Sequence, residues 1–287
     1  MVLKYKFRRF VARYFGGLVE LYFRLYSSCW KFSSCPIIVL TPGKVASSSV
    51  YSALKYYTNA PVFHIHRISQ EGIESSSREH LDSDRKSRPL HLIISKILRN
   101  KLANYQGKIY VITIIREPIS RFISSFFQNT EFYKNEIEMY NLQIDEQKTL
   151  ELLRLQLKND PTIELEEWFD NEIKNPFGID VYKNIFDCNK GYQIINNNRC
   201  HHLLIRMENL NHCFSSAIQE FLNIDKSVNI KNVNIGENKY YANSYNRIKS
   251  EIRLELEVME KVVSSRYFQH FYPEQEEIVR DKWLVKN

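Results

Sequence analysis

The sequence contains little glycine, proline or cysteine. Eight glycines, eight prolines and five cysteines among 287 residues exclude a fibrous or low-complexity chain. No two cysteines form a Cys-x-x-Cys pair, so the spacing encodes neither a zinc site nor a disulfide framework, and we expect reduced thiols in a cytosol-like compartment. No apolar stretch approaches the roughly 20 residues of a membrane-spanning helix, and the N-terminus does not resemble a signal peptide. Hydrophobic residues still make up 44% of the chain, which is enough for a sizeable core.

The excess positive charge is concentrated at the N-terminus. The chain has 40 basic and 33 acidic residues, a net charge of +7, and residues 1–35 hold seven cations and one anion. The other 252 residues are therefore nearly neutral, so we expect no nucleic-acid partner. Apolar residues in 1–35 recur at helical spacing, which predicts a basic amphipathic arm. Such an arm either packs on its own domain or lies on an anionic membrane or a partner.

The remaining residues, 36–287, are expected to form one α/β domain. Apolar runs predict strands at residues 37–40, 61–66, 108–115 and 203–205. Apolar residues at helical spacing predict helices at residues 50–57, 92–102, 119–126 and 213–222. Residues 69–90 are polar and are expected to form a loop. Strands alternating with helices imply a central, mostly parallel sheet flanked by helices on both faces.

A segment rich in hydroxyls follows the first predicted strand. Residues 41–49 read Thr-Pro-Gly-Lys-Val-Ala-Ser-Ser-Ser, and we call them the lysine segment. Glycine allows close backbone approach, lysine supplies a point charge, and the hydroxyls stand at a helix N-terminus whose free N–H groups attract anions. The alternative is a serine-capped helix with an exposed lysine. The residues assigned to this phosphate cradle are Gly43, Lys44, Ala46, Ser47, Ser48 and Ser49.

The lysine segment is not a Walker A loop, because Lys44 is followed by Val45 and Ala46 and no glycine lies five residues before Gly43. No central strand ends in the aspartate that would hold magnesium. Metal-assisted phosphoryl transfer is therefore disfavoured, and no metal site is predicted.

A second polar segment, residues 116–124, follows the strongest predicted strand. We call it the arginine segment. Arg116 stands at the end of the strand, Pro118 suits the first helical position, and Ser124 lies on one flank of the helix. A guanidinium offers a planar fork for a second phosphate. The alternative is an arginine paired with a nearby carboxylate.

Together, the lysine and arginine segments resemble the paired nucleotide-binding motifs of sulfotransferases, over about residues 36–130. The resemblance implies a P-loop-like sulfotransferase fold and 3′-phosphoadenosine-5′-phosphosulfate (PAPS) as the donor substrate. It assigns the lysine segment to the 5′-phosphosulfate, and Arg116 and Ser124 to the 3′-phosphate. It also implies that Lys239 helps to enclose the donor, a solvated loop being the alternative.

Later patterns are similar to bacterial sulfotransferase-like proteins associated with capsular polysaccharide synthesis. These are Trp168-Phe169-Asp170, Gly178-Ile179-Asp180-Val181-Tyr182, Gly191-Tyr192 and Arg206-Met207-Glu208-Asn209-Leu210. The likeness implies a carbohydrate acceptor, such as a capsular or other surface polysaccharide or its lipid-linked precursor. It also implies that Glu208 orients loops near the site. The basic arm would then hold a cytoplasmic enzyme at the inner membrane face, near glycan-assembly machinery.

A sugar hydroxyl is a poor nucleophile and needs a general base. His64 and His66 alternate along the second predicted strand, so they share one face at its carboxyl end. Histidine titrates near neutrality. We favour His66, which is nearer the strand end, over His64, and two structural histidines are the alternative. Lys44 is expected to meet the charge that develops on the departing nucleotide.

Four other polar residues are candidates for a role in the site or in the fold. His201 and His202 are expected to be structural, and Arg67 and Arg121 either bind an anionic acceptor or are solvated. Two other functions remain open at this point: a nucleotide-dependent, kinase-like phosphotransferase, and a non-catalytic, membrane-associated polysaccharide assembly protein.

Overall fold

A five-stranded sheet lies at the centre of the described chain. The computed structural model describes residues 18, 21, 35–82, 89–129, 144–159, 161–230 and 241–285. The strands are β1 (Ile37–Leu40), β2 (Val62–Ile65), β3 (Ile109–Ile115), β4 (Tyr192–Asn196) and β5 (Cys200–Arg206). Their order is β2-β1-β3-β5-β4, and only β4 runs antiparallel to its neighbour. The expected mostly parallel α/β domain is confirmed, whereas nearly all of the predicted amphipathic arm, residues 1–35, lies outside the described residues.

Helices cover both faces of this sheet. Those up to residue 128 are α3 (Ser47–Tyr57), α4 (Gln70–Asp82), α5 (Leu90–Ala103) and α6 (Pro118–Gln128). Those from residue 146 to residue 222 are α7 (Glu146–Leu157), α8 (Ile163–Phe169), the π-helix η2 (Asp170–Lys174), α9 (Asn175–Phe177), the short helices η3 (Val181–Lys183) and η4 (Met207–Asn209), and α10 (Leu210–Leu222). The last are α11 (Ala242–Glu251), α12 (Leu256–Ser264), α13 (Arg266–Phe271), η6 (Pro273–Gln275) and α14 (Glu276–Trp283).

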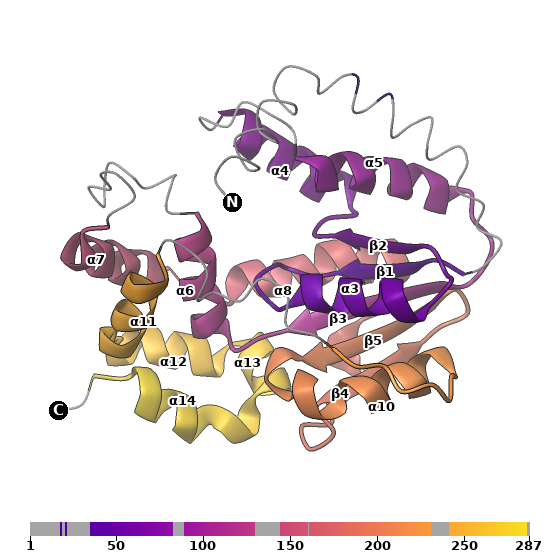
Figure 1. Ribbon diagram of the computed structural model, residues 1–287. Coiled ribbons are helices and arrows are strands. Elements are labelled where there is room, and N and C mark those ends of the chain that lie inside the picture. The colour runs from indigo at the N-terminus through magenta and orange to yellow at the C-terminus, as the bar shows by residue number, and fades with distance from the viewer. Residues whose placement is uncertain are drawn as a thin grey trace.

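Alternation along the strands divides the core into two apolar clusters. In β1, Ile37 and Val39 pack with α3 and α10 on one face, which is the near face in Figure 1. Ile38 and Leu40 point to the other face, where residues of α5, α6, α8, α12 and α13 contribute to the core. Because apolar side chains cover both faces, the central strands appear in the sequence as continuous hydrophobic runs.

The expected loop at residues 69–90 is wrong over most of its length, because α4 occupies Gln70–Asp82. The residue that caps the start of this helix is distant in the sequence. Glu172 of η2 accepts hydrogen bonds from Ile68 N (2.5 Å), Ser69 N (2.8 Å) and Ser69 Oγ (2.8 Å). Ser69 Oγ in turn accepts from Gly72 N at 3.0 Å. A buried carboxylate at a helix N-terminus satisfies otherwise free N–H groups, so a tertiary contact overrides the polar composition.

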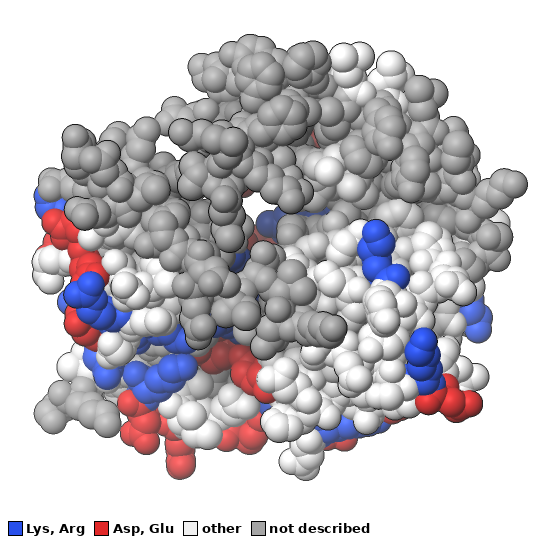
Figure 2. All heavy atoms as spheres, viewed as in Figure 1, with Lys and Arg blue, Asp and Glu red and all other residues white. Residues whose placement is uncertain are grey.

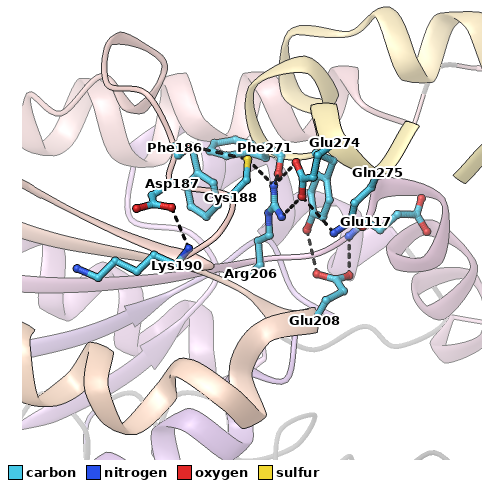
Figure 3. A network of polar contacts seen from close by, with 11 residues as sticks. Glu117, Phe186, Asp187, Cys188, Lys190, Arg206, Glu208, Phe271, Glu274 and Gln275 are labelled. Carbon is cyan, nitrogen blue, oxygen red and sulfur yellow. Dashed lines mark hydrogen bonds and ion pairs between the residues drawn. The ribbon is translucent and has the colours of Figure 1, made fainter. Parts of the chain in front are cut away.

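Arg206, at the end of β5, joins the sheet to the C-terminal helices (Figure 3). Its side chain is 1% exposed. The guanidinium donates to both carboxylate oxygens of Glu274, at 2.5 and 3.1 Å, and also to the carbonyl oxygen of Phe271 and the thiol of Cys188. The buried charge is thereby satisfied by a bidentate ion pair and by uncharged acceptors.

Two aromatic rings flank the same guanidinium. Its carbon lies 5.0 Å from the Phe186 ring centre and 4.7 Å from that of Tyr272. Cation–π attraction and packing therefore add to the hydrogen bonds. Arg206 is the side chain through which β5 holds the segment that follows α13.

We expect Arg206→Ala to lower the free energy of unfolding by about 2–4 kcal/mol, because it removes a buried, paired charge and leaves a cavity between two rings. Urea unfolding followed by tryptophan fluorescence measures this. The matched control is Arg247→Ala, which removes an exposed ion pair with Glu146 and should change stability by about 1 kcal/mol or less. Equal, small losses in both variants would contradict the assigned role.

Candidate functional site

The lysine segment and the arginine segment follow neighbouring strands. The lysine segment leads from β1 into α3, and the arginine segment leads from β3 into α6. Because β1 and β3 pair in parallel, both segments start at the same carboxyl edge of the sheet. Figure 2, in the view of Figure 1, shows Lys or Arg side chains recessed in a hollow beside the carboxyl ends of β1 and β2. Ligands of open α/β sheets bind at this edge.

The backbone of the lysine segment is unusual at three positions. Gly43, Lys44 and Ala46 have φ angles of 84°, 62° and 61°, and the last two are non-glycine residues in the left-handed region. Such residues cost of order 1–3 kcal/mol and persist where the surrounding structure determines them, often at ligand sites. Left-handed residues also help to form concave arrays of N–H groups that bind anions. The strained backbone of residues 43–46 is therefore more typical of an anion-binding loop than of a simple connection between a strand and a helix.

The serines of this segment do not cap α3. Ala46 occupies the N-cap position, and no side chain in the described part of the chain caps this helix. Ser47 Oγ instead contacts His64 Nε2 at 2.8 Å, Ser48 is half-buried, and Ser49 is buried. The alternative of a serine-capped helix is thus wrong, and the first turn of α3 keeps N–H groups that a ligand could use.

The arginine segment contacts the lysine segment directly. Arg116 Nη1 donates to the carbonyl oxygen of Lys44 at 3.1 Å. The Lys44 ammonium donates to the side-chain oxygen of Gln128, the last residue of α6. One hydrogen bond therefore connects the two segments, and a second connects the lysine segment to the end of α6, beyond the arginine segment. Sequence analysis missed Gln128, because a glutamine at a helix end carries no recognisable signal.

Arg116 is half-buried, and no carboxylate in the described ranges forms an ion pair with it. The alternative of a paired arginine therefore finds no support among these residues. The N-terminus of α6 is already occupied, since Glu117 accepts from Ile119 N at 2.7 Å and Ser120 N at 3.0 Å. An anion at this segment would thus meet the guanidinium, and Ser124 is half-buried two turns further along α6.

The two histidines of β2 lie beside the lysine segment. The ring centres of His64 and His66 are 5.1 Å apart, as expected for alternate residues of a strand. His66 Nδ1 lies 2.9 Å from the carbonyl oxygen of Thr41, and a Cβ placed on Gly43 would lie 4.0 Å from the His66 ring. Trp168 Nε1 donates to the carbonyl oxygen of His66 at 2.9 Å. These contacts hold the His66 ring against the cradle.

The contact with Thr41 determines the tautomer of His66. A carbonyl oxygen only accepts, so Nδ1 must carry the proton and donate it. Nε2 of the neutral ring is then left with its lone pair, as a general base requires. Nε2 of His64 already contacts Ser47 Oγ, so this ring is less available to accept a proton from a substrate.

Burial and neighbouring charges keep these rings neutral. Burial is the main cause that lowers the pKa of His64 to about 4, and His66 adds to the effect. The pKa of His66 is also lowered, first by burial and further by the charges of Arg67 and Lys44, while its bond to Thr41 acts in the opposite direction. Lys44 makes the last of these contributions, so the lysine segment lies close enough to His66 for its charge to act on the ring.

A third histidine extends the cluster. His91 of α5 lies 5.5 Å from the His66 ring centre and 6.3 Å from that of His80 on α4. Burial, with smaller contributions from the other three histidines, lowers the pKa of His91 to about 3. Sequence analysis missed this residue, because only the packing of α5 against β2 brings it to the site.

Arg67 and Arg121, the two arginines considered as acceptor-binding groups, both form ion pairs with acidic side chains. Arg121 is 4% exposed and pairs with Glu164 at 2.7 Å. Arg67 lies 3.9 Å from Glu164 and 4.0 Å from the buried Glu172. Both arginines therefore connect the sheet edge and α6 to α8 and η2.

The paired histidines of β5 lie in the sheet. His202 is fully buried with Nε2 2.9 Å from Thr113 Oγ1, and His201 stacks on Tyr110. These contacts fit the structural roles expected for His201 and His202.

Glu208 lies next to the arginine segment, as expected. Its Oε1 accepts from Glu117 N at 3.0 Å (Figure 3), and its Oε2 accepts from the Tyr272 hydroxyl at 3.1 Å. Lys239, the last residue assigned to the donor, lies outside the described residues.

In the described part of the chain, no group of three or more His, Cys, Asp or Glu side chains is arranged to hold a metal ion. None of the helices within the same ranges combines the length and apolarity needed to cross a membrane.

Comparison with known proteins relates the C-terminal half of the chain to a family. Residues 141–273 match the model of a family described as "Putative capsular polysaccharide synthesis protein". No curated protein and no solved structure matches the chain. The matched part contains β4, β5 and helices α7 to α13, and it includes the later patterns noted in the sequence. The likeness points to a role connected with polysaccharides.

The histidine cluster predicts a loss of stability in acid. In the folded protein the pKa values of His64 and His91 are about 4 and about 3, against about 6.5 when unfolded. Above pH 6.5 both states are neutral. As the pH falls below 6.5 only the unfolded state takes up protons, so the free energy of unfolding falls by about 1.4 kcal/mol per pH unit for each such group until the folded pKa is reached.

Urea unfolding at pH 7.0, 6.0 and 5.0 measures this loss, and His91→Gln should make it smaller. His212→Gln, on the exposed side of α10, is the control and should keep the wild-type slope. A His91→Gln variant with the full wild-type loss would contradict the assignment of half-buried, neutral rings.

Proposed function

We propose that this protein transfers a sulfuryl group from PAPS to a hydroxyl of a carbohydrate. The observation that supports this most is the hydrogen bond between Arg116 and Lys44, which brings the two anion-binding segments to one edge of the sheet. A donor with a 5′-phosphosulfate and a separate 3′-phosphate needs two such segments at a short distance from each other.

The lysine segment would hold the phosphosulfate end of the donor. Backbone N–H groups around Gly43 and Ala46 and the hydroxyls of Ser48 and Ser49 are suited to non-bridging oxygens. The Lys44 ammonium would neutralise the charge that develops on the bridging oxygen. Arg116 and Ser124 would hold the 3′-phosphate, with Lys239 assigned to the same donor by the family resemblance alone.

His66 is the proposed general base. The acceptor O–H bond breaks and its proton passes to His66 Nε2, while the acceptor oxygen forms a new bond to sulfur. The bond between sulfur and the bridging oxygen breaks, and adenosine 3′,5′-bisphosphate leaves with that electron pair. Positioning and charge stabilisation dominate a displacement of this kind. His64, which contacts Ser47, would orient the lysine segment.

The likeness of residues 141–273 to capsular polysaccharide synthesis proteins supports the acceptor class. We infer a capsular or other surface polysaccharide, or its lipid-linked precursor, as the acceptor. Peripheral association at the inner face of the membrane through residues 1–35 belongs to the same proposal.

The direct test is incubation with sulfur-labelled PAPS and a panel of polysaccharides, scored for transferred label. We expect Lys44→Ala to reduce turnover by roughly two to three orders of magnitude, because a preorganised charge at the leaving group is lost. Lys55→Ala, an exposed lysine in the last turn of the same helix, should retain wild-type turnover. Unchanged turnover in Lys44→Ala would remove the assignment of this residue.

Calorimetry separates the remaining functions. Magnesium-dependent binding of ATP, in place of binding of adenosine 3′,5′-bisphosphate, would indicate a phosphotransferase. Nucleotide binding without transfer to any acceptor would favour an assembly protein.

We expect His66→Ala to lower turnover by about 10²–10⁴-fold, because the general base is removed, while the affinity for adenosine 3′,5′-bisphosphate stays near wild type. His64→Ala should weaken turnover less. His201→Ala, a histidine of β5 that stacks on Tyr110, is the control. Parallel loss of nucleotide affinity and turnover in His66→Ala would show that the ring is structural.

A further inference from the structure

The backbone of Arg116 is held by one hydroxyl from a distant helix. The Tyr267 hydroxyl of α13 donates to the carbonyl oxygen of Arg116 at 2.9 Å, and Arg116 N lies 3.4 Å from the same hydroxyl oxygen as a donor. Tyr267 is completely buried. One phenol thus contacts both polar backbone groups of the residue that begins the arginine segment.

The next peptide unit is held in a similar way. Glu117 N donates to Glu208 Oε1, and the Tyr272 hydroxyl donates to Glu208 Oε2. The Tyr267 and Tyr272 rings stack with their centres 6.2 Å apart. Trp283 Nε1 lies 3.3 Å from Glu117 Oε2 as a further donor. Aromatic side chains from α13 to α14 therefore surround the turn that presents the guanidinium.

These hydroxyls remain donors throughout the range in which the protein would work. Burial raises the pKa of Tyr267 and of Tyr272 well above the ordinary value, and the charge of Glu208 adds to both shifts. The two tyrosines therefore contribute by holding the turn in place, and neither hydroxyl loses its proton in this pH range.

We propose that Tyr267 is a positioning residue that gives the site its preference for nucleotides with a 3′-phosphate. This inference rests on the proposed function. Tyr267 fixes the backbone end of Arg116, and the Lys44 carbonyl fixes the guanidinium end. With both ends held, the other guanidinium donors face a defined place, and binding a phosphate there requires little reordering. Without the hydroxyl, the turn is free to shift, and a displacement of about 1 Å is enough to weaken a bidentate contact.

The test compares Tyr267→Phe with the wild type by calorimetry. The two probes are adenosine 3′,5′-bisphosphate and adenosine 5′-monophosphate, which differ only in the 3′-phosphate. The ratio of their dissociation constants measures the preference for that group. We expect Tyr267→Phe to reduce this ratio about tenfold, the effect of losing one well-placed hydrogen bond, with little change in the affinity for the monophosphate.

Tyr192→Phe is the matched control. It also removes a buried tyrosine hydroxyl, but one that contacts Glu220 of α10. This variant should keep the wild-type ratio. Should Tyr267→Phe fail to fold, Glu208→Gln tests the same turn through the Glu117 N–H group, and we expect a smaller loss of preference in the same direction.

Two results would overturn the inference, and they are distinguishable. A wild-type preference for the bisphosphate that survives in both Tyr267→Phe and Glu208→Gln, or equal weakening of both probes, would show that Tyr267 only stabilises the fold. A wild-type protein that binds the two probes equally, or binds neither, would overturn the proposed function and this inference with it.

Discussion

The hydrogen bond from Arg116 to the Lys44 carbonyl determines the geometry of the site. Parallel pairing places β1 and β3 side by side, about 5 Å apart, but it does not fix the residues beyond the strands. The guanidinium does, because a planar group with five N–H donors can bind the carbonyl with one donor and keep the others for a ligand. No carboxylate among the described residues pairs with Arg116, and under the proposed function its remaining donors would hold the 3′-phosphate.

The strands could be predicted from the sequence because their physical signal is local. β1 and β3 are covered by helices on both faces, so their residues form apolar runs whose bounds were predicted to within one residue. α4 could not be predicted in this way, because Glu172, about a hundred positions away, caps its start. β4 is a half-buried edge strand with a mixed pattern, which carries no such signal. Tertiary contacts determine both elements.

The same distinction applies to the site. The lysine, serine and arginine residues that follow strand ends can be recognised in the sequence, because they form short contiguous motifs. The side chains that orient them are not, since Gln128, Glu208 and Tyr267 come from other elements. Glu208 and Tyr267 also belong to the part that matches the capsular polysaccharide synthesis family model, whereas the lysine segment and the arginine segment lie outside it. β5 of the matched part pairs with β3, so the two parts share one sheet.

Burial has two opposing effects on the histidines of the site. Burial lowers the pKa values of His64 and His66, which weakens each ring as a base. It also keeps each ring neutral at physiological pH, so that a lone pair is always present. The nearby Lys44 charge strengthens this effect on His66, and the same charge would be neutralised in part by a bound anion. Under the proposed function, a donor bound in the lysine segment would offset part of this charge and would therefore raise the pKa of His66.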